Sequence, residues 1–194
     1  MIEQEALQLK TKPWIVGCLL SAAAIGVGFF LGWTVLTVTT NNFAREPVMW
    51  DRVIEGFFRG VIIAGLQWPI VRSVGVRPVP FLLASGIGLA IGYPIGQFIA
   101  EPWGLELPWV WAFAIYGLSL GISQWLILRS HVKSGWLWIP LSTISWMLTI
   151  VIWGNLMNSG MDFVAGLGLG SVMYGLVAGA GLVWLVESQL QHPI

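Results

Sequence analysis

The chain has 194 residues, of which 57% are hydrophobic and only 9% are charged, against roughly 45–50% and about 25% in an ordinary soluble domain. This composition excludes a water-soluble globular protein. Nine Lys and Arg residues balance nine Asp and Glu residues without a long run of either sign, so no nucleic-acid partner is expected. One cysteine and two histidines are too few for an internal disulfide or a Cys/His metal site.

Six apolar runs are long enough to form membrane-spanning helices, since crossing about 30 Å of hydrocarbon takes ~20 helical residues. In chain order they are residues 14–38, 53–71, 79–100, 107–128, 136–156 and 163–186. The connections between them are short and contain charges, proline or glycine. Residues 1–194 are therefore predicted to form a single all-α integral membrane domain of six transmembrane helices, with a short cytoplasmic segment at 1–12.

The first run has features of a cleaved signal peptide, because Lys10 and Lys12 precede it and the small residues at 21–24 are typical of a cleavage site. However, the apolar run continues well past these small residues and takes part in an internal repeat. We therefore expect a retained helix.

The distribution of Lys and Arg predicts the orientation in the membrane. Six of the nine lie on the side of the N-terminus: Lys10, Lys12, Arg72, Arg77, Arg129 and Lys133. The opposite side has Arg45, Arg52 and Arg59, together with most of the acidic residues. Both termini are therefore predicted to be cytoplasmic.

The even-numbered runs contain an internal repeat. Gly60-(six residues)-Gln67-Trp68-(three residues)-Arg72 recurs at an offset of 57 as Gly117-(six residues)-Gln124-Trp125-(three residues)-Arg129. The sixth run continues the series at an offset of 58, where Tyr116-Gly117 reappears as Tyr174-Gly175. The third copy departs from the motif at its cytoplasmic end, where Glu187 replaces the arginine.

The first and third runs repeat as well, since Gly26, Gly28 and Gly32 match Gly86, Gly88 and Gly92 at an offset of 60. The repeating unit is a helical hairpin of about 60 residues, and its three copies cover approximately 14–72, 79–129 and 136–187. Because each copy crosses the membrane twice, all three point the same way. The predicted architecture is a pseudo-threefold bundle of three tandem parallel hairpins.

The Gly-(six)-Gln-Trp-(three)-Arg motif resembles a pattern in uncharacterised small multi-pass bacterial membrane proteins. The resemblance covers the second to the fifth run and brings no activity with it. It implies a multi-pass protein of a bacterial inner (cytoplasmic) or internal membrane.

The repeat glycines Gly60, Gly117 and Gly175 are expected at equivalent depths. Small residues spaced four apart lie on one helix face and let helix backbones approach closely. We interpret these glycines as structural contacts, and the alternative interpretation is a flexible gated path.

Gln67 and Gln124, each followed by a tryptophan, are the candidate ligand-binding residues of the repeat. Two buried carboxamides at matching positions can bond to each other between helices. They can also hold a lipid or quinone head group, or ligate the magnesium of a chlorophyll. Trp68 and Trp125 are assigned to the same hypothetical ligand or lipid contact.

No ionisable residue is expected near the middle of the membrane. Glu55 and Arg59 are predicted to form a partly immersed i,i+4 ion pair at the outer end of the second helix, with a substrate site as the alternative. Arg72, Arg129 and Glu187 end three equivalent helices on the cytoplasmic side. Two arginines and one glutamate are expected to form a salt-bridge network there, unless the arginines bind lipid phosphates instead.

The sequence contains no nucleophile–base pair, paired carboxylates or metal-ligand spacing, so an enzyme is not expected and no catalytic residue is assigned. The composition favours a non-catalytic integral membrane protein that binds lipid, an apolar cofactor or pigment, or a larger membrane complex in an accessory or assembly role. The alternative is a small transporter or channel with a path along the pseudo-threefold axis. Membrane lipids, a larger membrane complex or a second copy are the expected partners, and no cofactor is identified.

Overall fold

The computed structural model describes residues 2–40, 48–100 and 106–191, which are almost entirely helical. Five spans are single helices: α1 (Ile2–Thr39), α2 (Met49–Val71), α3 (Pro78–Ala100), α4 (Glu106–Leu128) and α5 (Trp138–Asn158). The sixth consists of α6 (Phe163–Tyr174), the π-helical turn η3 (Gly175–Gly179) and α7 (Ala180–Gln191). Two short 3₁₀ turns, η1 (Arg72–Val74) and η2 (Gly135–Leu137), lie in the connections.

All six spans are long and apolar enough to cross a membrane, which confirms the predicted number and order of spans. They therefore indicate a multi-pass membrane protein. The short segment predicted before the first span is continuous with α1 from Ile2 onward. Arg45, Glu46 and Glu101 of the predicted connections lie outside the described residues.

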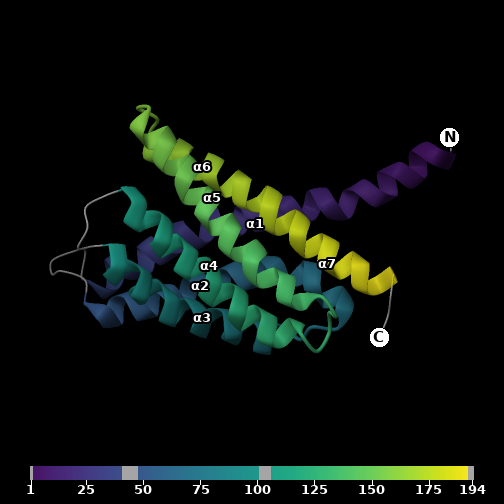
Figure 1. Ribbon diagram of the computed structural model, residues 1–194, viewed down its shortest axis with the longest axis horizontal. Helices are drawn as coiled ribbons and strands as arrows, with labels where there is room; N and C mark the ends of the chain where they lie inside the picture. Colours follow the sequence, from purple (N-terminus) through teal and green to yellow (C-terminus); the bar gives the residue numbers. More distant parts are fainter. Residues whose placement is uncertain (1, 41–47, 101–105, 192–194) are drawn as a thin grey trace.

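Each span packs against the next one along the chain, and the sixth packs back against α1, so the six spans form a closed ring. Figure 1 shows the start of α1 and the end of α7 at one end of the bundle. We call this end the terminal end and the opposite end, where α5 turns into α6, the distal end. At the distal turn the Asp162 carboxylate accepts hydrogen bonds from the backbone N–H groups of Val164 and Ala165, which caps α6.

Helix α2 begins four residues earlier than the sequence pattern predicted. Its first turn is closed by the Asp51 carboxylate, which accepts a hydrogen bond of 2.8 Å from the backbone N–H of Val48. As a result Arg59 is the eleventh of the 23 residues of α2 and lies at the middle of the helix. The expectation that no ionisable residue lies near mid-depth was therefore wrong.

The three repeat glycines each pack closely against the next span of the ring. Gly60 lies against Ser85 and Gly86 in α3, Gly117 against Ser142 and Thr143 in α5, and Gly175 against Cys18 and Ala22 in α1. A side chain at any of the three would overlap these neighbours. The absence of a side chain thus sets the short separation between the helix backbones.

Candidate binding cavity at the distal end

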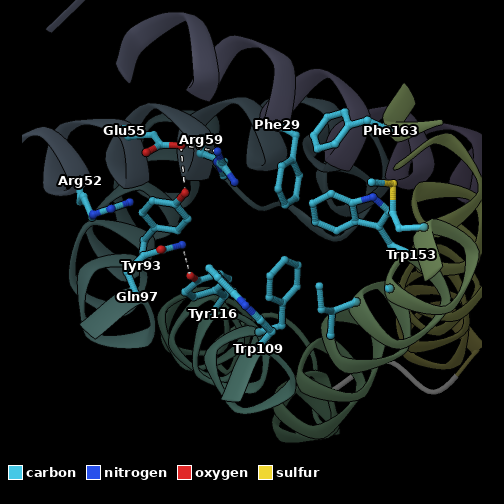
Figure 2. A pocket seen from close by; sticks show the side chains of 14 residues that line it. Phe29, Arg52, Glu55, Arg59, Tyr93, Gln97, Trp109, Tyr116, Trp153 and Phe163 are labelled. Atoms are coloured by element: carbon cyan, nitrogen blue, oxygen red, sulfur yellow. Dashed lines mark hydrogen bonds and ion pairs between the residues drawn. The ribbon is translucent and has the colours of Figure 1, made fainter. Parts of the chain in front are cut away.

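A cavity of about 380 Å³ opens at the distal end of the ring. Side chains from all six spans line it, as Figure 2 shows. They are Phe29, Arg52, Glu55, Arg59, Tyr93, Gln97, Trp109, Phe113, Tyr116, Ile150, Trp153, Gly154, Met157 and Phe163. The cavity thus lies inside the ring and combines one charged wall, on α2, with several aromatic walls.

A buried ion pair forms the charged wall. The Arg59 guanidinium donates from Nη2 to Oε1 of Glu55, one helical turn away, and the two side chains are only 2% and 1% exposed. The Tyr93 hydroxyl from α3 donates to the same carboxylate oxygen at 3.0 Å. The ion pair was predicted to be partly immersed, whereas the structure buries it completely.

Aromatic rings and a glycine hold Arg59 in place. Its guanidinium carbon lies 4.2 Å from the centre of the Phe29 ring and 4.7 Å from that of the Tyr93 ring, within the range of a cation–π interaction. Gly32 of α1 faces the guanidinium so closely that a side chain there would overlap it. These neighbours from α1 and α3 thus accommodate the charge of Arg59 at the middle of α2.

The polar groups of this wall are not all satisfied within the described residues. Nε and Nη1 of Arg59 and Oε2 of Glu55 are buried without a hydrogen-bond partner, and so is the indole N–H of Trp153. Leaving buried donors and acceptors unpaired costs free energy, most of all for charged groups. A ligand that supplied the missing partners would recover this free energy.

The remaining walls are mainly aromatic. The Phe29 ring lies 6.1 Å, between centroids, from the rings of both Phe113 and Trp153. Tyr116 is buried beside them and accepts a hydrogen bond of 2.7 Å from Gln97 Nε2. Such walls suit a flat or apolar group rather than a hydrated ion.

Below the cavity, toward the terminal end, a chain of buried side chains fills the centre of the ring. Trp146 packs edge-on against Tyr174, and the Tyr174 hydroxyl accepts a hydrogen bond of 3.3 Å from Gln67. Gln124 donates to Oε1 of Gln67 at 3.0 Å and to the Ser85 hydroxyl at 3.1 Å. Its own carbonyl accepts from Trp138 Nε1 at 2.6 Å.

The structure thus brings Gln67 and Gln124 together and bonds them to each other. Both side chains are fully buried. The role of these glutamines and of Trp68 and Trp125 in binding a ligand stays a prediction, since their carboxamides already have protein partners and the indole N–H of Trp68 donates to the Val76 carbonyl. The cavity described above is a separate region of the ring.

The tryptophan and the arginine of the repeat motif interact with each other. Arg72 and Arg129 lie over the rings of Trp68 and Trp125, with guanidinium carbons 5.9 and 5.7 Å from the ring centres. The Trp-(three)-Arg spacing places the two side chains one helical turn apart. The first two copies of the repeat therefore each carry a cation–π pair at the terminal end.

Glu187 does not join these arginines. Within the described residues it forms no ion pair with Arg72 or Arg129, and its carboxylate accepts a hydrogen bond of 3.0 Å from the indole N–H of Trp14. The direct salt bridge expected between Glu187 and Arg72 or Arg129 is therefore not formed. The physical reason is that the sixth span packs against α1, which supplies a donor to Glu187, while each arginine lies over a tryptophan of its own helix.

Sequence reasoning missed most of the cavity because its walls come from six different spans. One feature of the repeat indicated which side chains face the interior of the ring. The residue before each repeat glycine is Arg59, Tyr116 or Tyr174, and the structure buries all three inside the ring. The match with Tyr174-Gly175 was visible in the sequence, and Arg59-Gly60 occupies the same register.

No protein-family model, no curated protein and no solved structure matches the chain. The function is therefore inferred from the geometry of the cavity alone.

Proposed function

We propose that the protein binds an amphipathic small molecule of the membrane in the distal cavity, without catalysing a reaction on it. The observation that carries this proposal is the Arg59–Glu55 pair, which lines the cavity and contains buried nitrogen and oxygen atoms without a hydrogen-bond partner. A charged pair at mid-helix costs less when additional hydrogen bonds satisfy it. A polar head group in the cavity would supply those bonds, and the aromatic walls would hold its apolar part.

The side chains that fill the centre of the ring favour a binding function over the transporter alternative. The side chains from Trp146 to Trp138 occupy the space between the cavity and the terminal end, so transport would require them to move. Two of the hydroxyls at mid-depth of α5 are also used locally, because Ser145 and Thr149 donate to carbonyls of their own helix, while the buried Ser142 hydroxyl has no partner among the described residues. Binding requires no such movement.

The three hairpins are, in this proposal, related by a pseudo-threefold axis. The contacts of the repeat glycines support it, because they join α2 to α3, α4 to α5 and η3 to α1 in the same sense around the ring. The inward side chains before these glycines support it as well. Only the first copy places a charge there, Arg59, whereas the other two place Tyr116 and Tyr174.

The test compares small molecules that co-purify with three forms of the protein. Gly154 lines the cavity and Gly65 does not, and a Cβ atom added at either position meets no neighbouring atom within 4 Å. G154L should therefore fill part of the cavity without disturbing the fold, and G65L is the matched control. Each form is extracted from native membranes in polymer-bounded discs and analysed by mass spectrometry.

We expect at least one small molecule to be enriched with the wild-type protein and with G65L and to be depleted from G154L. The same molecules in the same amounts in all three samples would contradict the proposal.

A further inference from the structure

A second hollow lies beside the distal cavity, in the face between α1 and α6. It is an apolar groove of about 790 Å³. On α6 its walls extend from Phe163 to Val172, which corresponds to roughly 14 Å at 1.5 Å per residue. Phe30 and Val164 on its rim are 72% and 76% exposed, so in a membrane this groove faces hydrocarbon.

The groove and the cavity adjoin each other, because Phe29 and Phe163 line both of them. A molecule with its head in the cavity would have to pass its tail beside these two rings to reach the groove. The groove is almost purely apolar, with Ser171 as its one polar side chain among the described lining residues, and the Ser171 hydroxyl is bonded to its own helix.

The charges near the cavity indicate a neutral head group. In the distal half of α2, Asp51 and Glu55 balance Arg52 and Arg59. The lining itself holds Arg52 and Arg59 against Glu55, and the neighbouring Asp51 brings the net charge of this part of α2 to zero. The unpaired donors at the site, two on Arg59 and one on Trp153, outnumber the one unpaired acceptor on Glu55, which favours a head that carries hydrogen-bond acceptors such as carbonyl oxygens.

The aromatic walls specify the shape of the head. Phe29, Phe113, Tyr116 and Trp153 present their rings around a cavity of about 380 Å³, and aromatic side chains pack favourably with flat rings. Figure 2 shows Phe29, Tyr116 and Trp153 grouped around the open centre, with Arg59 and Glu55 on one side of it.

Building on the proposed binding function, we infer that the ligand is a quinone-type lipid, with a neutral, carbonyl-bearing ring in the distal cavity and a hydrocarbon tail in the groove between α1 and α6. The ring carbonyls accept hydrogen bonds from Arg59, and the ligand reaches the cavity from the bilayer through the side of the ring of helices. The tail remains in contact with the membrane.

The test uses two probes that share a head: decylubiquinone and its tail-free parent, dimethoxy-methyl-benzoquinone. Binding to the purified protein in phosphatidylcholine nanodiscs is measured by equilibrium dialysis, with empty nanodiscs subtracted. Gly168 lines the groove and not the cavity, and a Cβ atom added there meets no neighbouring atom within 4 Å, so G168L is expected to fill the groove alone. G154L fills the cavity, and G65L is the control.

We expect G154L to weaken binding of both probes by roughly tenfold or more, and G168L to do so for decylubiquinone only. G65L should bind both probes like the wild type. R59K, which keeps the charge but loses the Nε and Nη1 donors, should weaken both probes, and its fold is checked by gel filtration.

If G168L weakened the binding of both probes equally, or of neither probe, the assignment of the groove to the tail would be overturned. Failure of both probes to bind the wild-type protein would overturn the quinone class. The proposed function would survive that second result if another small molecule still co-purified with the wild type and not with G154L, so the two failures are distinguishable.

Discussion

At the residue scale, the main feature of the molecule is the ion pair between Glu55 and Arg59, which is buried inside an otherwise apolar bundle of helices. Sequence reasoning identified Glu55 and Arg59 as a pair from their spacing. The burial of the pair could not be predicted from the sequence, because the residues that surround it come from other helices. They are Tyr93, Phe29 and Gly32. The depth of Arg59 was misjudged because the apolar run was counted from residue 53, whereas the Asp51 cap starts the helix at Met49.

Removing one member of this pair should be far more costly than removing both. E55Q leaves the buried Arg59 charge uncompensated, which should lower the free energy of unfolding by about 3–5 kcal/mol. The double variant E55L/R59M replaces the pair by apolar side chains and should be much closer to the wild type. Unfolding in mixed micelles containing a denaturing detergent, followed by tryptophan fluorescence, measures both. A double variant as unstable as the single one would contradict this explanation.

The glutamine chain is a second feature at this scale. Q124L would leave the Trp138 indole N–H and the Gln67 carbonyl oxygen without their present partners. The expected loss of stability is about 1–3 kcal/mol, the cost of unpaired buried polar groups. The same unfolding measurement tests it. A stability equal to that of the wild type would show that water or a changed side-chain conformation replaces these bonds.

At the element scale, the spans followed from hydropathy, because each is a predominantly apolar run of sufficient length, including the second, which contains Glu55 and Arg59. The repeat also indicated where the helices touch, since only glycine permits the contact seen at Gly60, Gly117 and Gly175. The two hollows could not be predicted in this way. Their walls are formed by side chains from several helices. The hollows therefore depend on how those helices pack together and not on the sequence of any single helix.

Enlarging any repeat glycine should force two helices apart. G60L, G117L and G175L are each expected to destabilise the bundle by an amount on the order of 1–3 kcal/mol, as overpacking does. G65L is the control, because a side chain at Gly65 meets open space. Unfolding of the four variants under one set of conditions gives the comparison. If G60L, G117L and G175L were all as stable as G65L, the close packing described here would be refuted.

At the scale of the whole molecule, the ring of spans places both ends of the described chain at one end of the bundle (Figure 1). The side of the membrane on which this end lies is predicted from the unequal distribution of Lys and Arg. Most of these residues lie near the terminal end, which is therefore predicted to be cytoplasmic. The cavity would then open toward the outside of the cell.

Cysteine labelling tests this orientation. In a C18A background, S159C lies in the distal turn, while S73C and S130C lie at the terminal end, and all three serines are exposed. A membrane-impermeant maleimide applied to intact cells should label S159C and should label the other two only after permeabilisation. Labelling of S73C and S130C alone in intact cells would reverse the orientation.

The central claim is that the distal cavity holds a ligand, and native mass spectrometry of the intact protein released from nanodiscs tests it most directly. The account predicts a bound small molecule, at about one per chain, on the wild type and on G65L, and its loss from G154L. An unliganded wild-type protein under conditions that preserve membrane-protein–lipid complexes, or a bound mass that persists unchanged in G154L, would contradict it.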